Sequence, residues 1–373
     1  MRVDYRGRDF KNADARAKRG HIVCMSTWRL DLTAKDRGKI AVIGPSFFGY
    51  VEAVTDELTR QGHPAHYFDE RHSNSIYSKI FYRLGFDYPI RQARQKHLSR
   101  LIEHILDGGF GSVLLIDVEV IDRVFCETLQ SHNVDVFLYM WDSAANKPGF
   151  VDMIGTIKAA ATFDPLDAEN LGMRYIPLFA ETVYKPGADA PLRTTGSVAF
   201  NGTMHSHRAR QLALLERILG SGVRVEKLLY YHSKILYFIK SIFSPSSWYF
   251  ASGISTTGYP KETIADLYMR SEYVVDIHHP GQSGLTSRTF EALRAGALLV
   301  TFNKTVNSLP ASLAARCACI DKVEEAPAAL GKLAGIPAIT PDDDYFLSLE
   351  RFVSDIVAFM ALPITQARTD PDQ

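Results

Sequence analysis

The sequence has few cysteines, no long apolar run and no excess of charge of either sign. Its 373 residues include only four cysteines, and 42 basic residues balance 42 acidic ones. So few cysteines exclude a disulfide framework, and we expect reduced thiols in a cytoplasmic protein. No segment approaches the ~18 uncharged apolar residues of a membrane-spanning helix. The N-terminus lacks the apolar region of a signal peptide. We therefore expect at most a peripheral contact with the membrane surface.

The balanced charge also bears on partners. A formal net charge of zero gives no electrostatic reason to expect a nucleic-acid partner. The composition, 46% hydrophobic and 23% charged, is that of an ordinary globular chain. Because single cores stop growing near ~250–300 residues, this length predicts two domains.

Several catalytic motifs are missing. Residues 44–49 follow an apolar run but lack the G-x-G-x-x-G spacing of a dinucleotide-binding turn, which disfavours a nicotinamide dehydrogenase. No P-loop, nucleophile elbow or H-E-x-x-H sequence occurs. His205 and His207 have no third ligand in view, so we expect solvated loop residues rather than a metal site.

The chain does contain a repeated alternation of short apolar runs and helical patterns. Strands are predicted at 39–44, 65–68, 112–117, 134–140, 159–163, 174–177, 197–201, 273–277 and 297–301. Alternation of this kind predicts parallel sheets, and the proline-rich stretch at 184–191 divides it in two. We therefore predict an α/β protein with two facing Rossmann-like domains and a cleft between them. The expected divisions are an extension of little order at 1–37, a first domain at 38–183, a linker at 184–196, a second domain at 197–345, and a helix and tail at 346–373.

The most informative segment follows the strand at 273–277. Thr286 or Ser287 can cap the next helix. Arg288 lies in its first turn, where a cation opposes the helix dipole unless an anion is nearby. The helix start and Arg288 together predict a phosphate site. Glu291 lies one turn deeper, outside the capping-box position, and can accept hydrogen bonds from sugar hydroxyls. An ordinary capped turn has the same pattern and remains the alternative.

A second basic turn follows the strand at 197–201. Gly202 permits a close approach of the backbone, and Arg208 opens a helix from which it can reach a phosphate. This turn belongs to the same predicted domain as the first, so both can contribute to one anion site.

Residues 284–301 read GLTSRTFEALRAGALLVT and resemble the donor-site loop, helix and strand of bacterial GT-B glycosyltransferases. These enzymes come from polysaccharide and lipopolysaccharide clusters and are related to the group-one and CgeB-like families. Residues 175–179 and 184–186 resemble the interdomain connection of these enzymes. Residues 198–203 resemble the first strand and turn of their donor domain. The similarity spans about residues 38–360.

The resemblance implies a GT-B glycosyltransferase that moves a sugar from a nucleotide-sugar to a polysaccharide, lipopolysaccharide, lipid-linked or other glycan acceptor. Glu291 matches the glutamate that binds the donor ribose. A metal or other cofactor is not expected, because the helix dipole and basic residues stabilise the leaving group. Ser283 replaces the second glutamate of the retaining group-one pattern, so the anomeric outcome stays open. The expected donor-binding residues are Gly202, Arg208, His279, Gly284, Leu285, Thr286, Ser287, Arg288 and Glu291.

Three alternatives accompany this interpretation. His279 and Pro280 resemble the pair by which some sialyltransferases hold a CMP-sugar, which would indicate an inverting sialyl- or Kdo-type transferase. A nucleotide-sugar epimerase would use the same cleft without an acceptor. A non-catalytic binding or assembly protein can have the same fold.

The catalytic base of an inverting transferase is sought among acids at strand ends of the first domain. Asp117, Glu119 and Asp142 lie at or just beyond such ends. We take Asp142 as the candidate base, although acids at these positions are also routine helix caps.

Residues 227–243 have apolar residues at helical spacing and lysines on the other face. The pattern predicts an amphipathic helix packed on the core. The alternative is a basic amphipathic helix that lies on an anionic membrane.

Overall fold

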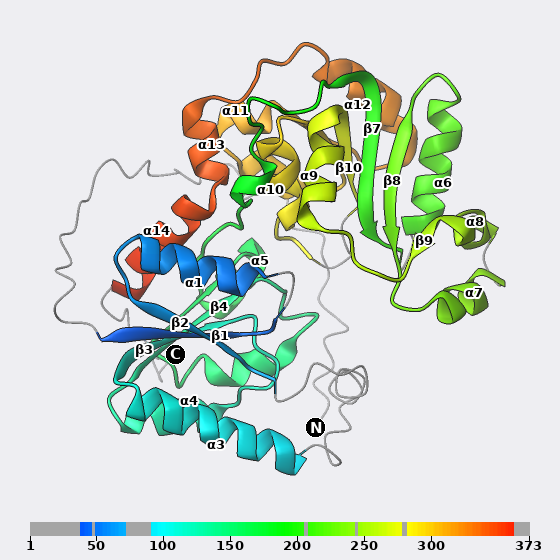
Figure 1. Ribbon diagram of the computed structural model, residues 1–373. Coiled ribbons are helices and arrows are strands. Elements are labelled where there is room, and N and C mark those ends of the chain that lie inside the picture. The colour runs from blue at the N-terminus through cyan, green and yellow to red at the C-terminus, as the bar shows by residue number, and fades with distance from the viewer. Residues whose placement is uncertain are drawn as a thin grey trace, which may run out of the picture. The chain divides into compact units, whose positions relative to one another are not determined.

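The computed structural model describes residues 38–46, 49–71, 91–204, 208–242, 245–277 and 282–361. Three sets of residues discussed above lie outside the described ranges. They are the predicted extension at 1–37, the tail after 361, and the histidines His205, His207 and His279. The described residues all belong to one compact unit. Its strands form two parallel six-stranded sheets (Figure 1).

The first sheet has the strand order β2-β1-β3-β4-β5-β6. Its strands are Lys39–Gly44 (β1), Ala65–Asp69 (β2), Phe110–Ile116 (β3), Asp135–Met140 (β4), Ala159–Thr162 (β5) and Arg174–Tyr175 (β6). Side chains alternate between its faces, so Leu114 and Ile116 join one core while Val113 and Leu115 join another. Burial of both faces explains why these strands are continuous apolar runs in the sequence. The described helices between these strands include α1 (Tyr50–Arg60), α3 (Arg91–Asp107), α4 (Arg123–Ser131) and α5 (Pro165–Leu171).

The second sheet has the strand order β12-β11-β10-β7-β8-β9. Its strands are Thr194–Thr203 (β7), Val225–Tyr230 (β8), Ile254–Ser255 (β9), Ser271–Asp276 (β10), Leu298–Thr301 (β11) and Cys317–Cys319 (β12). Its helices include α6 (Arg208–Leu219), α9 (Lys261–Arg270), α10 (Ser287–Arg294) and α12 (Ala326–Leu333). This is the Rossmann order, and it reverses between β7 and β10. In the first sheet the order reverses between β1 and β3. Ligands of such sheets bind beyond the carboxyl ends of the strands at these two switch points.

The last helix of the described chain returns to the first sheet. The helix predicted within 346–373 begins only after Ser348. That residue is extended and separates α13 (Pro341–Leu347) from α14 (Leu349–Ala361). On α14, the ring of Phe352 lies 5.0 Å from that of Tyr139. Helix α14 lies beside α1 (Figure 1), where Gln61 Nε2 donates to the carbonyl oxygen of Glu350 at 2.9 Å. The first half is therefore completed by a helix from the far end of the described chain.

The helix predicted at 227–243 is wrong in both extent and orientation. Residues through Tyr230 form β8, and the helix α7 covers only Lys234–Ile242. Its buried side chains are Tyr237 and Ser241, while Phe238 and Ile239 are exposed. The periodicity identified an apolar stripe, but that stripe points to solvent. Within the described ranges, no helix combines the length and apolarity needed to cross a membrane.

Candidate functional site

The two basic turns predicted from the sequence meet at the switch point of the second sheet. Gly202 lies near the end of β7, and a Cβ atom there would lie 3.1 Å from Arg288 Nη2 and 3.6 Å from Arg208 Nη1. A Cβ atom here would contact both guanidinium groups and would push that of Arg288 back slightly. The two arginines, 80 positions apart in the sequence, therefore converge on one glycine.

Charged side chains of both signs meet at this point. Arg288 pairs with Asp276, the buried last residue of β10. Burial lowers the pKa of Arg208 to about 10, and repulsion between its charge and that of Arg288 is the next largest cause. The carboxylate of Glu291 also attracts Arg288, so the two guanidinium groups lie near two carboxylates, those of Asp276 and Glu291. The Nε atom of Arg288 is buried and has no hydrogen-bond partner within the described structure.

Asp276 corrects part of the sequence-based reasoning. The anion that Arg288 requires is supplied within the chain by this carboxylate. Thr286 begins α10 as predicted, but its side chain makes no capping bond. Its Oγ1 instead donates to Asp276 Oδ2 at 3.3 Å. The turn is therefore organised around Asp276 rather than around a side-chain cap.

The loop before α10 is held by Asp164, the residue that follows Phe163 after β5. Asp164 Oδ2 accepts hydrogen bonds from the backbone N–H of Ser283 at 2.8 Å and of Gly284 at 2.9 Å. The same carboxylate caps α5. Leu285 is a buried core residue. These loop N–H groups are thus bonded within the chain, and the carboxylate that binds them comes from the first half.

Gly284 has a steric reason to be glycine, because a Cβ atom there would overlap the buried ring of Phe163. We expect Gly284→Ala to destabilise the fold by about 1–3 kcal/mol, the usual cost of overpacking a core. Gly331→Ala is the matched control, since Gly331 lies in α12 and a Cβ atom there would meet no other atom within 4 Å. That control should gain about 0.5–1 kcal/mol. Chemical denaturation of both variants measures the difference, and equal stabilities would contradict the packing argument.

Glu291 is buried and already has partners. The hydroxyl of Tyr50 on α1 donates to Glu291 Oε1 at 2.7 Å, and the side chain of Tyr184 also hydrogen-bonds to it. Burial raises the pKa of Glu291. Lys261 Nζ lies 4.5 Å from the centroid of the Tyr50 ring. The sequence pattern assigned no structural duty to Glu291, whereas the structure makes it the acceptor for two tyrosines. Its assignment to a ribose remains a prediction.

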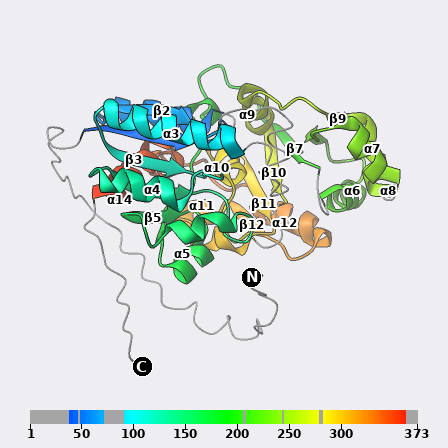
Figure 2. The ribbon, with the colours of Figure 1, turned by 90° about the horizontal axis from the view of Figure 1, so that it is seen from below.

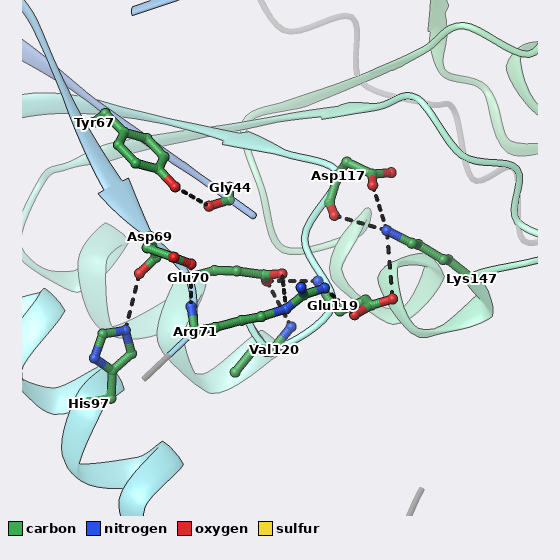
Figure 3. Close-up of polar contacts among 10 residues, drawn as sticks. All are labelled: Gly44, Tyr67, Asp69, Glu70, Arg71, His97, Asp117, Glu119, Val120 and Lys147. Atoms are coloured by element: carbon green, nitrogen blue, oxygen red, sulfur yellow. Dashed lines mark hydrogen bonds and ion pairs between the residues drawn. The ribbon is translucent and has the colours of Figure 1, made fainter. Parts of the chain in front are cut away.

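The switch point of the first sheet holds a second charged cluster (Figure 3). Asp117 follows β3 with a positive φ of 51°. Lys147 Nζ bonds both the carboxylate and the carbonyl oxygen of Asp117 and lies 3.8 Å from Glu119 Oε1. Burial raises the pKa of Asp117 to about 6. Its Oδ1 atom is buried without a hydrogen-bond partner in the described structure.

Glu70 supports this cluster from the end of β2. Its Oε2 atom accepts hydrogen bonds from the backbone N–H groups of Glu119 at 2.8 Å and Val120 at 2.9 Å (Figure 3). Arg71 Nη2 donates to Glu119 at 2.6 Å. Burial raises the pKa of Glu70 from 4.5 to about 7. The two backbone hydrogen bonds and the nearby Arg71 act in the opposite direction, but their effect is smaller. Glu70 therefore fixes the loop that carries Glu119.

The raised pKa of Glu70 predicts a pH-dependent stability. Between pH ~4.5 and ~7 the folded chain retains a proton at Glu70 that the unfolded chain releases, so the free energy of unfolding falls as pH rises. We expect Glu70→Gln to remove this decline, gaining about 3 kcal/mol relative to the wild type between pH 5 and pH 8. Urea denaturation across that range measures it. Glu103→Gln, on the exposed face of α3, is the control; parallel curves for Glu70→Gln and the wild type would rule out the effect.

Asp142, the candidate base, follows β4. Its Oδ1 atom accepts hydrogen bonds from the Ser143 N–H and from Asn146 Nδ2, both at 2.9 Å. It thus stabilises its own turn, as acids at strand ends commonly do. It is partly exposed, unlike Asp117. Among the described residues, no cluster of three or more His, Cys, Asp or Glu side chains is arranged to hold a metal ion.

Three residues that contribute to these sites, Asp164, Lys147 and Tyr50, were not predicted from the sequence. Asp164 carried a usable signal, since it is an acid directly after a predicted strand. Lys147 and Tyr50 carried none, because each depends on a partner placed by the fold.

No protein-family model matches the sequence, and no curated protein does. Solved structures share its arrangement of sheets. AviGT4, a glycosyltransferase involved in avilamycin A biosynthesis, has a TM-score of 0.56 and 12% identity over 86% of this chain and 96% of its own. Anabaena Alr3699/HepE, solved with UDP and glucose, has a TM-score of 0.57 and 10% identity over 87% and 99%.

This chain has the GT-B fold. The predicted fold class is therefore confirmed. Another structure with this fold arrangement is the UDP-GlcNAc 2-epimerase of Methanocaldococcus jannaschii, solved with UDP-GlcNAc and UDP. It has a TM-score of 0.51 and 10% identity over 86% of this chain and 99% of its own. GT-B neighbours thus include both a glycosyltransferase and an epimerase.

Proposed function

We propose that this chain is a glycosyltransferase that binds a nucleotide-sugar at the switch point between β7 and β10. The observation that carries the proposal is the convergence of Arg208 and Arg288 on Gly202, together with the buried Arg288 Nε, which has no hydrogen-bond partner in the described structure. A diphosphate is attracted by both guanidinium groups and can accept a hydrogen bond from the buried Arg288 Nε. The partial positive charge at the start of α10 adds to the attraction. The neighbours solved with UDP support the choice of ligand class.

The acceptor is assigned to the switch point of the first sheet. Tyr50, after β1, and Asp164, after β5, both contact the α10 region. Asp117 and Asp142 follow the two strands that lie between β1 and β5 in the sheet order. The carboxyl ends of parallel strands share one edge, so these two carboxylates belong to the edge that meets the donor half. A sugar hydroxyl bound there is within reach of the donor.

Asp142 is our candidate for the general base. It is the more exposed of the two carboxylates, whereas Asp117 is buried and paired with Lys147. In the proposed reaction the acceptor oxygen attacks the anomeric carbon while Asp142 takes its proton. The bond from that carbon to the diphosphate breaks, and the nucleoside diphosphate leaves with the electron pair. The likeness of residues 284–301 to transferases of polysaccharide and lipopolysaccharide clusters supports a surface glycan or a lipid-linked glycan as acceptor.

Calorimetry against UDP, GDP, dTDP and CMP tests the donor class. We expect one of these nucleotides to bind at low salt; the absence of binding by all four would overturn the proposal. Preference for CMP would favour the sialyl- or Kdo-type transferase. Binding without any turnover would favour the assembly-protein alternative.

A nucleotide-sugar epimerase is the second candidate, because the M. jannaschii epimerase shares the fold. Incubation with the preferred nucleotide-sugar separates the two activities. A transferase releases nucleotide faster when a glycan acceptor is added. An epimerase changes the sugar configuration without an acceptor, which proton NMR of the product detects.

A further inference from the structure

Two short helices of the second half expose an apolar surface. Helices α7 (Lys234–Ile242) and α8 (Pro245–Tyr249) lie between β8 and β9 in the chain. The α7–α8 patch consists of Ile235, Leu236, Phe238, Ile239, Ile242, Trp248 and Tyr249, whose exposed fractions range from 49% to 73%. These are seven of the twelve large hydrophobic side chains exposed in the described structure. Their concentration within fifteen residues distinguishes them from the scattered apolar residues of ordinary surfaces.

The outward orientation of the patch is fixed by packing beneath it. Tyr237 and Phe250 are buried in the core of the second half. The rings of Phe238 and Trp248 lie 5.5 Å apart and join the two helices. Figures 1 and 2 both show α7 and α8 together beside α6 and β9, the edge strand of the sheet.

The distribution of polar residues on these helices is the reverse of the usual one. Ser241 and Ser247 are each only 2% exposed, whereas Ile239 and Trp248 are about half exposed. A helix at the surface of a globular protein normally buries its isoleucines and exposes its serines. Water is therefore a poor partner for this surface, and an apolar partner is a better one.

The charge of the segment indicates what that partner is. From Leu228 to Pro260 the sequence contains two lysines, Lys234 and Lys240, and no aspartate or glutamate. Lys227 and Lys261, which flank this stretch, pair with Glu216 and Glu181. Trp248 and Tyr249 are the residue types that prefer the interface between lipid and water. Lysine stems can lie along apolar surface with the ammonium group among phosphates. Two copies of the chain paired through this patch would instead face lysine with lysine, because a symmetric contact brings the same surface together.

We propose that the α7–α8 patch docks the protein peripherally on an anionic lipid bilayer. Helix α7 lies in the interface plane, with its isoleucines and Phe238 among the acyl-chain boundary and Lys234 at the headgroup level. Docking does not depend on the proposed transferase activity, since it uses residues of neither switch point.

Flotation of the full chain with vesicles tests the proposal. Vesicles of phosphatidylcholine with 30% phosphatidylglycerol are compared with pure phosphatidylcholine, and the bound fraction is titrated against lipid. We expect the wild type to float mainly with the anionic vesicles. Ile239→Asp and Trp248→Gln should each weaken binding at least tenfold, and Lys234→Gln about fivefold. Val124→Asp, a substitution at an exposed apolar residue on α4, should float like the wild type.

Two controls are built into the patch variants. Unchanged melting temperatures show that their fold is intact, and all of them retain residues 1–37, so a difference in flotation cannot come from that segment. A wild type that does not float, or patch variants that float equally well, would overturn the proposal. A wild-type dimer in solution that Ile239→Asp converts to a monomer, without lipid binding, would assign the patch to a second copy.

Discussion

Replacement of Asp142 by asparagine should lower turnover by about 10²–10⁴-fold, the contribution of a positioned general base. Asparagine can still accept the hydrogen bonds from the Ser143 N–H and from Asn146, so the turn after β4 should persist. Nucleotide affinity should not change, because the donor binds at the other switch point. Steady-state release of nucleotide with a glycan acceptor measures turnover, and calorimetry measures affinity.

Two further variants determine whether Asp142 itself is the base. Asp135→Asn, at the start of β4, removes a surface ion pair with Lys158 and should leave turnover unchanged. Asp117→Asn tests the neighbouring carboxylate. A large loss in Asp117→Asn with full activity in Asp142→Asn would transfer the role to Asp117.

Replacement of Arg288 by alanine should have two separable effects. Loss of a charge-assisted bond to the donor phosphates should weaken nucleotide binding by about 1.5–3 kcal/mol. The buried Asp276 carboxylate would also lose its cation, which should reduce the free energy of unfolding by about 3–5 kcal/mol. The double variant Arg288→Ala/Asp276→Ala should recover most of the stability but none of the affinity. Nucleotide titration and chemical denaturation of both variants test this separation.

Arg294 provides the matched control on the same helix. It is a buried arginine paired with Asp344 at 2.9 Å, in the last turn of α10 rather than the first. Arg294→Ala should cost comparable stability while nucleotide affinity stays that of the wild type. Equal loss of affinity in both arginine variants would mean that α10 is merely distorted, and the phosphate assignment of Arg288 would be wrong.

The sequence predicts the six strands of the first sheet and β7, β10 and β11 of the second, because both faces of these sheets are buried. It misses β8, β9 and β12, which lie toward the edges of the second sheet and are mostly only half-buried. A parallel strand covered on two sides must be a continuous apolar run, and such runs end at identifiable turns. The convergence of Gly202, Arg208 and Arg288 could also be anticipated, since each follows a strand of the same predicted sheet. Periodicity failed at α7 because it locates an apolar stripe without saying which side faces the core.

The polar partners of the candidate site could not be predicted in the same way. Tyr50 and Glu291 are separated by 241 positions, and Asp164 and Gly284 by 120. No local pattern of residues encodes which hydroxyl or carboxylate arrives at a given turn from so far along the chain. These contacts are fixed by the packing of both halves, which only the structure contains.

The return of α14 to the first sheet has a consequence for biosynthesis. Phe137 and Tyr139 leave the ribosome about 200 residues before Phe352 and Phe359, the rings that cover them. Translation at ~5–20 residues per second leaves this apolar face uncovered for at least ~10 seconds. The nascent first half must therefore wait for the end of α14 before it is complete, and in that interval it is a natural client for a chaperone that binds exposed aromatic surface.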